Sequence, residues 1–244
     1  MEIDQLTGRA DVHMHTKASD GLRTVQQVLD YIEDWGGLDV AAITDHDVLD
    51  ASLWAYSHRG RYSFDIIPGV EVTAREGHVV ALWVTQPIPK QKSLQETAAA
   101  IHEPGGIAIL AHPGEPCIAG RHMLRYFRHP EVLLEWDIDV IESYNAGSIT
   151  PGNNVLAQRL AHQLPLPVVG NSDAHTLNAI GYGITRFKGH TAADFRAALA
   201  EGRTVAEGAS WPITDYLKLS PASIHRKLNK FLGMSLRPIR QFRH

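Results

Sequence analysis

Two histidines and an aspartate lie close together near the start of the chain. His13 and His15 end a short apolar run in the stretch DVHMHTKASDG, and Asp20 follows in a Ser-Asp-Gly turn. Side chains two apart on a strand share a face, so both imidazoles would point the same way and could hold one metal ion. Asp11, on the same face, is a candidate to orient one ring. One such pair is more often a surface or core feature, so further ligands are needed to support a metal site.

The same residue types recur where later apolar runs end. They are His46 in ITDHD, Glu71 in GVEVT, His78 in HVVALWV, His112 in AHPG, and Asp173 and His175 in NSDAH. Burying so many carboxylates and imidazoles without a counter-charge is costly, and bound cations would compensate them. Nitrogen and oxygen donors without a thiolate favour Zn²⁺, Mn²⁺ or Fe²⁺. The whole set therefore predicts a metal site rather than separate surface groups.

Short strands and helices alternate along the chain and would position these residues. Helices are predicted over Thr24–Trp35, Ser93–His102, Asn154–Gln163 and Thr191–Glu201, the last with a capping box. Apolar runs typical of strands covered on both faces are Ala10–His15, Val40–Thr44, Ile66–Val72, His78–Val84, Ile107–Ala111, Val140–Tyr144 and Val168–Gly170. This order favours a parallel α/β barrel, in which functional residues gather at the carboxyl ends of the strands.

One connection is too short for a parallel crossover. Only residues 73–77 separate the third run from the fourth, whereas a crossover needs a dozen residues or more. We therefore predict an antiparallel hairpin that brings Glu71 beside His78. Residues 85–92 are long enough to return extended along the barrel before the next helix.

Length and composition indicate one large domain followed by a basic segment. The chain has 244 residues, a net charge of −4 and one cysteine, Cys117. Absence of a signal peptide, of a long apolar run and of paired cysteines predicts a cytoplasmic protein with no transmembrane segment. Residues 1–210 are expected to form the barrel, and the acidic charge of this part disfavours a general nucleic-acid binder. Residues 211–244 form a basic tail, in which Ser223–Leu232 could be a short amphipathic helix.

The motifs together resemble the PHP family, the polymerase-and-histidinol-phosphatase phosphoesterases. DVHMHTKASDG, ITDHD, GVEVT, HVVALWV, AHPG and NSDAH occur in family order over residues 11–175. The resemblance implies a distorted seven-stranded (β/α)7 barrel with two to three divalent metal ions (Mn, Fe or Zn) at the strand ends. By this resemblance the first ion is held by His13, His15, Glu71 and Asp173, the second by Glu71, His78 and His112, and the third by Asp20, His46 and His175. Asp20 stands where some family members have histidine.

The resemblance implies hydrolysis of a phosphate ester by metal-activated hydroxide. Glu71, Asp173 and His46 are the expected catalytic residues, with Arg75 beside Glu71 as the preferred phosphate clamp. A small-molecule phosphomonoester of the sugar, nucleotide or histidinol phosphate class is the leading substrate. Many relatives known for nucleotide or oligonucleotide hydrolysis carry an inserted subdomain between the AHPG and SDAH segments. Only about sixty residues separate His112 from Asp173 here, so any insertion is small, which weighs against a nuclease. Three alternatives stay open: a nuclease on short oligonucleotides, a metal-bound scaffold without activity, and an amidohydrolase-like enzyme.

Three polar residues near strand ends have no firm assignment. Glu115 and Glu142 are further carboxylates at the expected rim. Asn145 is equally consistent with a supporting role and with a turn. The sequence does not define the oligomeric state.

Overall fold

The computed structural model describes residues 6–119 and 122–219 and is built around one mixed sheet. The strands are β1 (Gly8–Asp11), β2 (Val40–Ile43), β3 (Asp65–Thr73), β4 (His78–Leu82), β5 (Ile107–Ala111), β6 (Val140–Asn145), β7 (Val168–Asn171), β8 (Gly183–Phe187) and β9 (Val205–Gly208). They are ordered β7-β6-β5-β4-β3-β2-β1-β8-β9 across the sheet. All seven predicted strands are present, with boundaries shifted by up to four residues.

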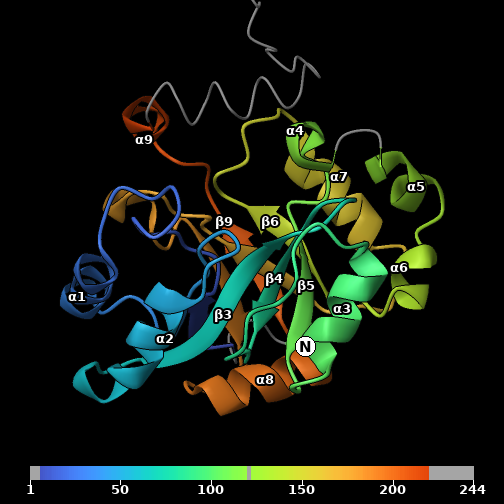
Figure 1. The fold of residues 1–244 in the computed structure, drawn as a ribbon. Coiled ribbons are helices and arrows are strands. Elements are labelled where there is room, and N and C mark those ends of the chain that lie inside the picture. The colour runs from blue at the N-terminus through green and yellow to red at the C-terminus, as the bar shows by residue number, and fades with distance from the viewer. Residues whose placement is uncertain (1–5, 120–121, 220–244) are drawn as a thin grey trace, which may run out of the picture.

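The helices cover the outside and the lower end of this sheet (Figure 1). The longer helices are α1 (Val25–Trp35), α2 (Asp50–Ser57), α3 (Leu94–His102), α7 (Asn153–Ala161) and α8 (Ala192–Ala200); the shorter ones are α4 (Pro116–Ala119), α5 (Met123–Arg128), α6 (Val132–Glu135) and α9 (Ile213–Lys218). Helices α1, α3 and α8 each begin with a capping box, at Thr24, Ser93 and Thr191, in which side chains satisfy the free N–H groups of the first turn.

The prediction of a seven-stranded (β/α)7 barrel is corrected to a nine-stranded sheet that nearly closes. Strand β8 pairs antiparallel with β1, and β9 pairs antiparallel with β8. The other edge, β7, meets this pair through side chains. Thr185 Oγ1 accepts from Gly170 N and donates to Gly170 O, both at 3.0 Å, and Thr204 Oγ1 donates to Val168 O at 2.6 Å. A hydroxyl can do both because it is a donor and an acceptor.

The predicted hairpin is confirmed. Strands β3 and β4 are antiparallel, with Thr73 opposite His78 and Glu71 opposite Val80. Strand β4 is also antiparallel to β5, whereas β5, β6 and β7 pair in parallel. The metal-ligand candidates of β3 and β4 therefore reach the same end of the sheet from opposite chain directions.

An apolar core fills the barrel and is sealed at the end where the parallel strands begin. Its inward-facing side chains include Ile67, Ile109 and Phe187, and α8 contributes Phe195 and Leu199. Each large apolar side chain removed from water stabilises the fold by about 1.5–3 kcal/mol. The interior is therefore solid at the α8 end and leaves polar chemistry to the opposite rim.

The described chain continues past residue 210 and remains in contact with the barrel. Trp211 is buried, and α9 places buried Asp215 beside Thr176. The division at residues 210 and 211 stays a prediction, and the expected helix at residues 223–232 lies outside the described residues. Within the described part of the chain, no helix has the length and apolarity needed to cross a membrane.

Candidate metal site

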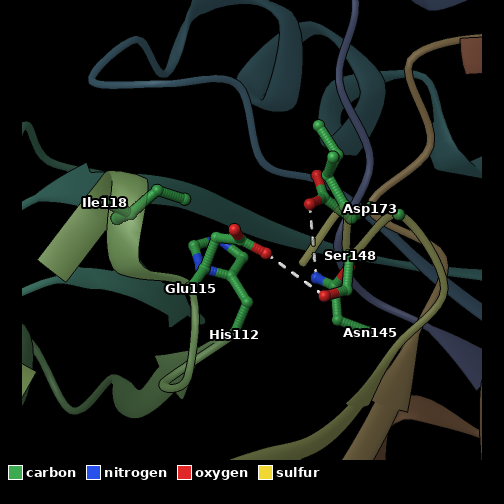
Figure 2. A pocket seen from close by; sticks show the side chains of 8 residues that line it. His112, Glu115, Ile118, Asn145, Ser148 and Asp173 are labelled. Carbon is green, nitrogen blue, oxygen red and sulfur yellow. Dashed lines mark hydrogen bonds between the residues drawn. The ribbon is translucent and has the colours of Figure 1, made fainter. Parts of the chain in front are cut away.

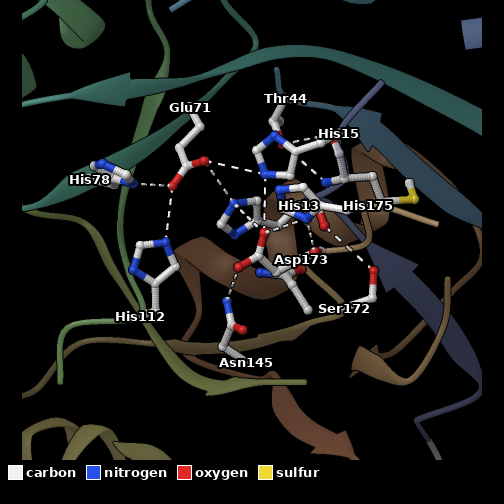
Figure 3. Close-up of polar contacts among 12 residues, drawn as sticks. His13, His15, Thr44, Glu71, His78, His112, Asn145, Ser172, Asp173 and His175 are labelled. Atoms are coloured by element: carbon white, nitrogen blue, oxygen red, sulfur yellow. Dashed lines mark hydrogen bonds and ion pairs between the residues drawn. The ribbon is translucent and has the colours of Figure 1, made fainter. Parts of the chain in front are cut away.

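The side chains expected to hold the first ion meet at the upper rim of the barrel (Figure 3). The rings of His13 and His15 lie 5.2 Å apart. Their Nε2 atoms lie 3.2 and 3.3 Å from Glu71 Oε2, and 3.6 and 3.1 Å from Asp173 Oδ1. Two imidazole nitrogens and two carboxylates from strands far apart in sequence therefore surround one point.

Glu71 extends the cluster in a second direction. Its Oε1 lies 2.7 Å from His78 Nδ1 and 3.0 Å from His112 Nε2. Its side chain is fully buried, and its two oxygens face different sets of histidines. Glu71 therefore joins the two sets of histidines that were expected to hold the first and second ions.

The residues expected for a third ion lie together on the other side of His15. Asp20 Oδ1 is 3.1 Å from His175 Nε2 and 3.8 Å from His15 Nδ1. His46 reaches Asp20 Oδ2 with Nε2 at 3.8 Å and Glu71 Oε2 with Nδ1 at 2.9 Å. Four overlapping groups of possible metal ligands result, and all nine predicted residues belong to at least one of them.

Several nitrogen and oxygen atoms of the cluster lack hydrogen-bond partners. The buried unpaired atoms at this rim include His13 Nε2, both ring nitrogens of His15, Glu71 Oε2, His112 Nδ1 and His175 Nε2. A buried polar atom without a partner costs roughly 1–3 kcal/mol, so such a concentration needs an explanation. Lone pairs converging on one space are what a cation satisfies, and the donor set fits Zn²⁺, Mn²⁺ or Fe²⁺.

The charge state of the cluster follows from burial and mutual contact. Burial disfavours an ionised Glu71, but the surrounding imidazoles hold its pKa well below the ordinary value. Burial and like-charge neighbours lower the pKa of His15 to about 4, and burial lowers that of His78 to about 4. Burial opposes charge on His13 and His112 as well, yet the nearby carboxylates raise the pKa of both. His13 and His112 therefore have to release protons before they can bind a cation.

A second layer of residues orients the ligands, and Glu142 is its centre. Glu142 Oε1 accepts from His13 Nδ1 at 2.9 Å, and Oε2 accepts from Asn145 Nδ2 at 2.9 Å. Asn145 also donates to Asp173 Oδ2 at 3.2 Å. This contact favours a role for Asn145 in orienting the candidate ligands rather than in forming a turn. Asp11, the sequence-based candidate for orienting a ring, instead accepts from the backbone N–H groups of Ser172 and Gly181. Glu142 takes that position because β6 lies across the barrel interior from His13.

The Ser-Asp-Gly turn is held in place by Asp45. Asp45 accepts from Thr16 N at 2.7 Å and from Ser19 Oγ at 2.5 Å. Gly21 passes so close to His15 that a Cβ there would lie 2.3 Å from His15 O. Only glycine permits that approach, and it returns Asp20 to the rim.

The segment after β9 closes one side of the site. Trp211 Nε1 donates to Ser172 O at 2.7 Å, and its ring lies 5.8 Å from that of His175. Tyr216 Oη donates to Ala146 O at 3.2 Å. The loops that follow β6 and β7 are therefore tied to α9, which the sequence had separated from the barrel.

A small pocket opens beside His112 and Asp173 (Figure 2). Glu115, buried in its wall, accepts from Ser148 Oγ at 3.2 Å, from Asn153 Nδ2 at 3.1 Å and from Thr150 Oγ1. Ile118 and Ile149 line the same pocket. Glu115 thus shapes the space next to the metal ligands, a role that only its tertiary contacts reveal.

Arg75 does not lie in this cluster. Its guanidinium pairs with Glu96 at 3.2 Å, and the two side chains are 57% and 52% exposed. Its role as a phosphate clamp stays a prediction.

Part of the chain matches a known protein-family model. Residues 151–204 match a family model described as PHP-associated. An uncharacterized protein of Methanocaldococcus jannaschii is 27% identical over 172 residues, which cover 64% of this chain and 94% of that protein.

Solved structures share the fold. A two-domain protein of Bacteroides vulgatus that contains a predicted PHP-like metal-dependent phosphoesterase aligns with a TM-score of 0.63 at 20% identity, over 82% of this chain and 64% of that one. The lesion-specific endonuclease of Pyrococcus furiosus aligns with a TM-score of 0.56 at 16% identity, over 80% of this chain and 56% of that one. This chain therefore spans less than two thirds of either protein.

Proposed function

We propose that the chain is a PHP-family protein and that it is a metal-dependent hydrolase of small phosphomonoesters. The observation that carries the proposal is the set of buried, unpaired ligand atoms on His13, His15, Glu71, His112 and His175. Ionised carboxylates, and imidazoles once His13 and His112 have released their protons, would present lone pairs to cations.

The nine residues would hold two to three divalent ions. When bound, such ions would supply an activated water and neutralise charge on the phosphoryl oxygens. Glu71, which contacts imidazoles on both sides, would be shared between ions. Asp173 and His15 would complete the first set, and His46 with Asp20 would complete the third.

The residues around the ions would fix ligand orientation and exclude solvent. Glu142 holds the Nδ1 proton of His13, so Nε2 presents its lone pair to the ion. Asn145 holds one oxygen of Asp173, and the other oxygen stays available. Trp211 covers the outer side of His175 and limits access of water there.

The lining of the small pocket beside His112 weighs against a polyanionic substrate. Among the described residues that line it, none is a lysine or arginine, and Glu115 is a carboxylate. A nucleic-acid strand would need cations along its path to bind well.

A turnover screen tests the proposal. Full-length protein loaded with Mn²⁺ would be assayed on phosphomonoesters, phosphodiesters and short oligonucleotides, with His13→Ala/His15→Ala as the control. We expect phosphomonoesters to give the highest kcat/KM and the double variant to be inactive. Equal rates for the double variant and the wild type would remove the cluster from the chemistry.

The likeness to the Pyrococcus furiosus endonuclease favours one alternative, a nuclease. In that case phosphodiester cleavage would exceed monoester cleavage and would fall steeply with salt. A metal-bound scaffold without activity would bind the ions and turn over none of the three substrate groups.

A further inference from the structure

A second pocket lies outside the barrel, between the end of α1 and strands β8 and β9. It has a volume of about 370 Å³, within the size range of small-molecule sites. None of the nine metal-ligand candidates lines it. Its polar and aromatic lining consists of Arg9, Trp35, Tyr182, Arg186 and Glu207.

Two arginines face each other in this pocket. Arg9 on β1 is directly opposite Arg186 on β8 in the antiparallel ladder. Like charges directly opposite on neighbouring strands destabilise a sheet unless something neutralises them. Glu207 neutralises only Arg186, whose Nε donates to it at 3.0 Å.

The guanidinium of Arg9 has no acidic partner among the described residues. Its Nε is buried without a hydrogen-bond partner, and its Cζ lies 5.4 Å from the centre of the Trp35 ring. Asp39 accepts from the backbone N of Arg9 and from His190 Nδ1 rather than from the guanidinium. A planar guanidinium with an unpaired Nε is suited to a carboxylate or phosphate group, because a guanidinium can bind such groups through two parallel hydrogen bonds.

The remaining walls suit an apolar body attached to that group. Ile180 and Ile184 line the pocket and are themselves nearly buried. Gly181 adopts φ +77°, and a Cβ there would lie 2.3 Å from the Trp35 ring. Glycine at this position therefore lets the indole pack closely against the chain and form the wall.

We propose that this pocket binds the oxyanion group, carboxylate or phosphate, of a small molecule whose apolar part packs against Trp35 and Ile184. Arg9 supplies the charge and the fork of donors. The site is separate from the metal cluster and does not depend on the proposed hydrolase activity.

Calorimetric titration of the metal-loaded full chain tests the site. The probes are phenylphosphonate, benzoate and benzyl alcohol, which present a phosphate-like, a carboxylate and an uncharged group on the same ring. We expect at least one anion to bind, benzyl alcohol not to bind, and Arg9→Gln to weaken binding about ten-fold or more. The stronger of the two anions identifies the group that the site prefers.

Two further variants separate this site from the metal cluster and from unfolding. Glu71→Gln should keep the anion binding, whereas binding at the metals would be lost with it. Arg9→Lys keeps the charge but not the fork, so we expect binding weaker than wild type, with thermal melting confirming the fold. Wild-type affinity in Arg9→Gln or in Arg9→Lys overturns the proposal, as does failure of both anions to bind the wild type.

Discussion

The two ends of the sheet carry the same residue types, but their polar atoms are hydrogen-bonded at one end and partly unpaired at the other. Where the parallel strands begin, acids are paired with N–H donors: Asp139 accepts from Ala108 N and His102 Nε2, both at 2.7 Å. Asp65 likewise accepts from Ala192 N at 2.7 Å. Where the strands end, the facing atoms of His13, His15 and Glu71 have no hydrogen-bond partner.

This difference shows what marks a functional end of a barrel. An aspartate beside a histidine is found at both rims, so residue type alone does not distinguish them. At the α8 end each carboxylate satisfies backbone N–H groups and stabilises the fold. At the other end the unpaired atoms are held in place by the surrounding structure, which is the arrangement expected of a ligand-binding site.

The largest expected effect comes from Glu71→Gln at the metal rim. This change removes the charge that contacts histidines on both sides, so bound metal should fall and kcat/KM should decrease by about 10³-fold or more. Metal analysis and turnover on a phosphomonoester measure the two effects. The matched control is Asp139→Asn at the opposite rim; if both variants lose activity equally, the contrast between the rims is refuted.

The affinity of the histidine cluster for metal ions should depend on pH. Because the carboxylates raise the pKa of His13 and His112 in the metal-free protein, each must lose a proton on binding. The apparent affinity should therefore rise with pH, by about ten-fold per unit for each proton released. Competition with a chelator between pH 6 and pH 8 measures it, and a flat profile would contradict the assignment.

Glu142→Gln tests the layer behind the ligands. The amide cannot supply the negative charge that fixes the His13 proton, so metal affinity should fall about 10- to 100-fold. The fold should persist, because an amide of nearly the same shape replaces the carboxylate. If metal affinity were unchanged in Glu142→Gln, the role of Glu142 would be purely structural.

Asp139→Asn should affect stability and leave chemistry alone. It weakens the bonds from Ala108 N and His102, so the free energy of unfolding should fall by about 1 kcal/mol. Chemical denaturation measures the loss, and kcat and KM should match the wild type. A fall in kcat would show that the α8 end is coupled to the site.

The smallest change in stability is expected for Arg75→Gln. Its exposed pair with Glu96 contributes less than about 1 kcal/mol, so the unfolding midpoint should barely move. The predicted clamp requires the guanidinium to leave Glu96 and hold the substrate phosphate, in which case KM rises several-fold. A KM equal to that of the wild type would exclude Arg75 from the site.

Sequence reasoning predicted the first seven strands and the hairpin because their apolar runs and short turns are local signals. It missed β8 (GITRF) and β9 (VAEG), which are short and carry charged residues on a partly exposed face. Their assignment depends on pairing with β1 from the other end of the chain, which no local pattern records. Helices α2, α4, α5, α6 and α9 were missed as well, because four to eight residues are too few to give a clear helical periodicity.

The convergence of the candidate ligands could be predicted from the sequence, whereas their role in binding metal stays a prediction. All nine candidate ligands converge, since most of them lie in or just after strands whose ends meet at one rim of the barrel. Glu142 was not assigned, because its role lies in a contact with His13 across 129 positions of sequence. Asp11 was predicted to orient a ring because it shares a strand face with His13 and His15. That pattern does not show that the Asp11 carboxylate already accepts hydrogen bonds from backbone N–H groups.

Because β1 pairs with β8, the barrel cannot close until most of the chain has been synthesised. Gly8 is opposite Phe187, and Val12 N donates to Asn171 Oδ1 at 3.0 Å. At about 5–20 residues per second, synthesis places roughly ten to forty seconds between these partners. During that interval β1 has an unpaired edge, which invites association with other chains. Closure of the barrel, and with it assembly of the histidine cluster, is therefore a late event on the ribosome.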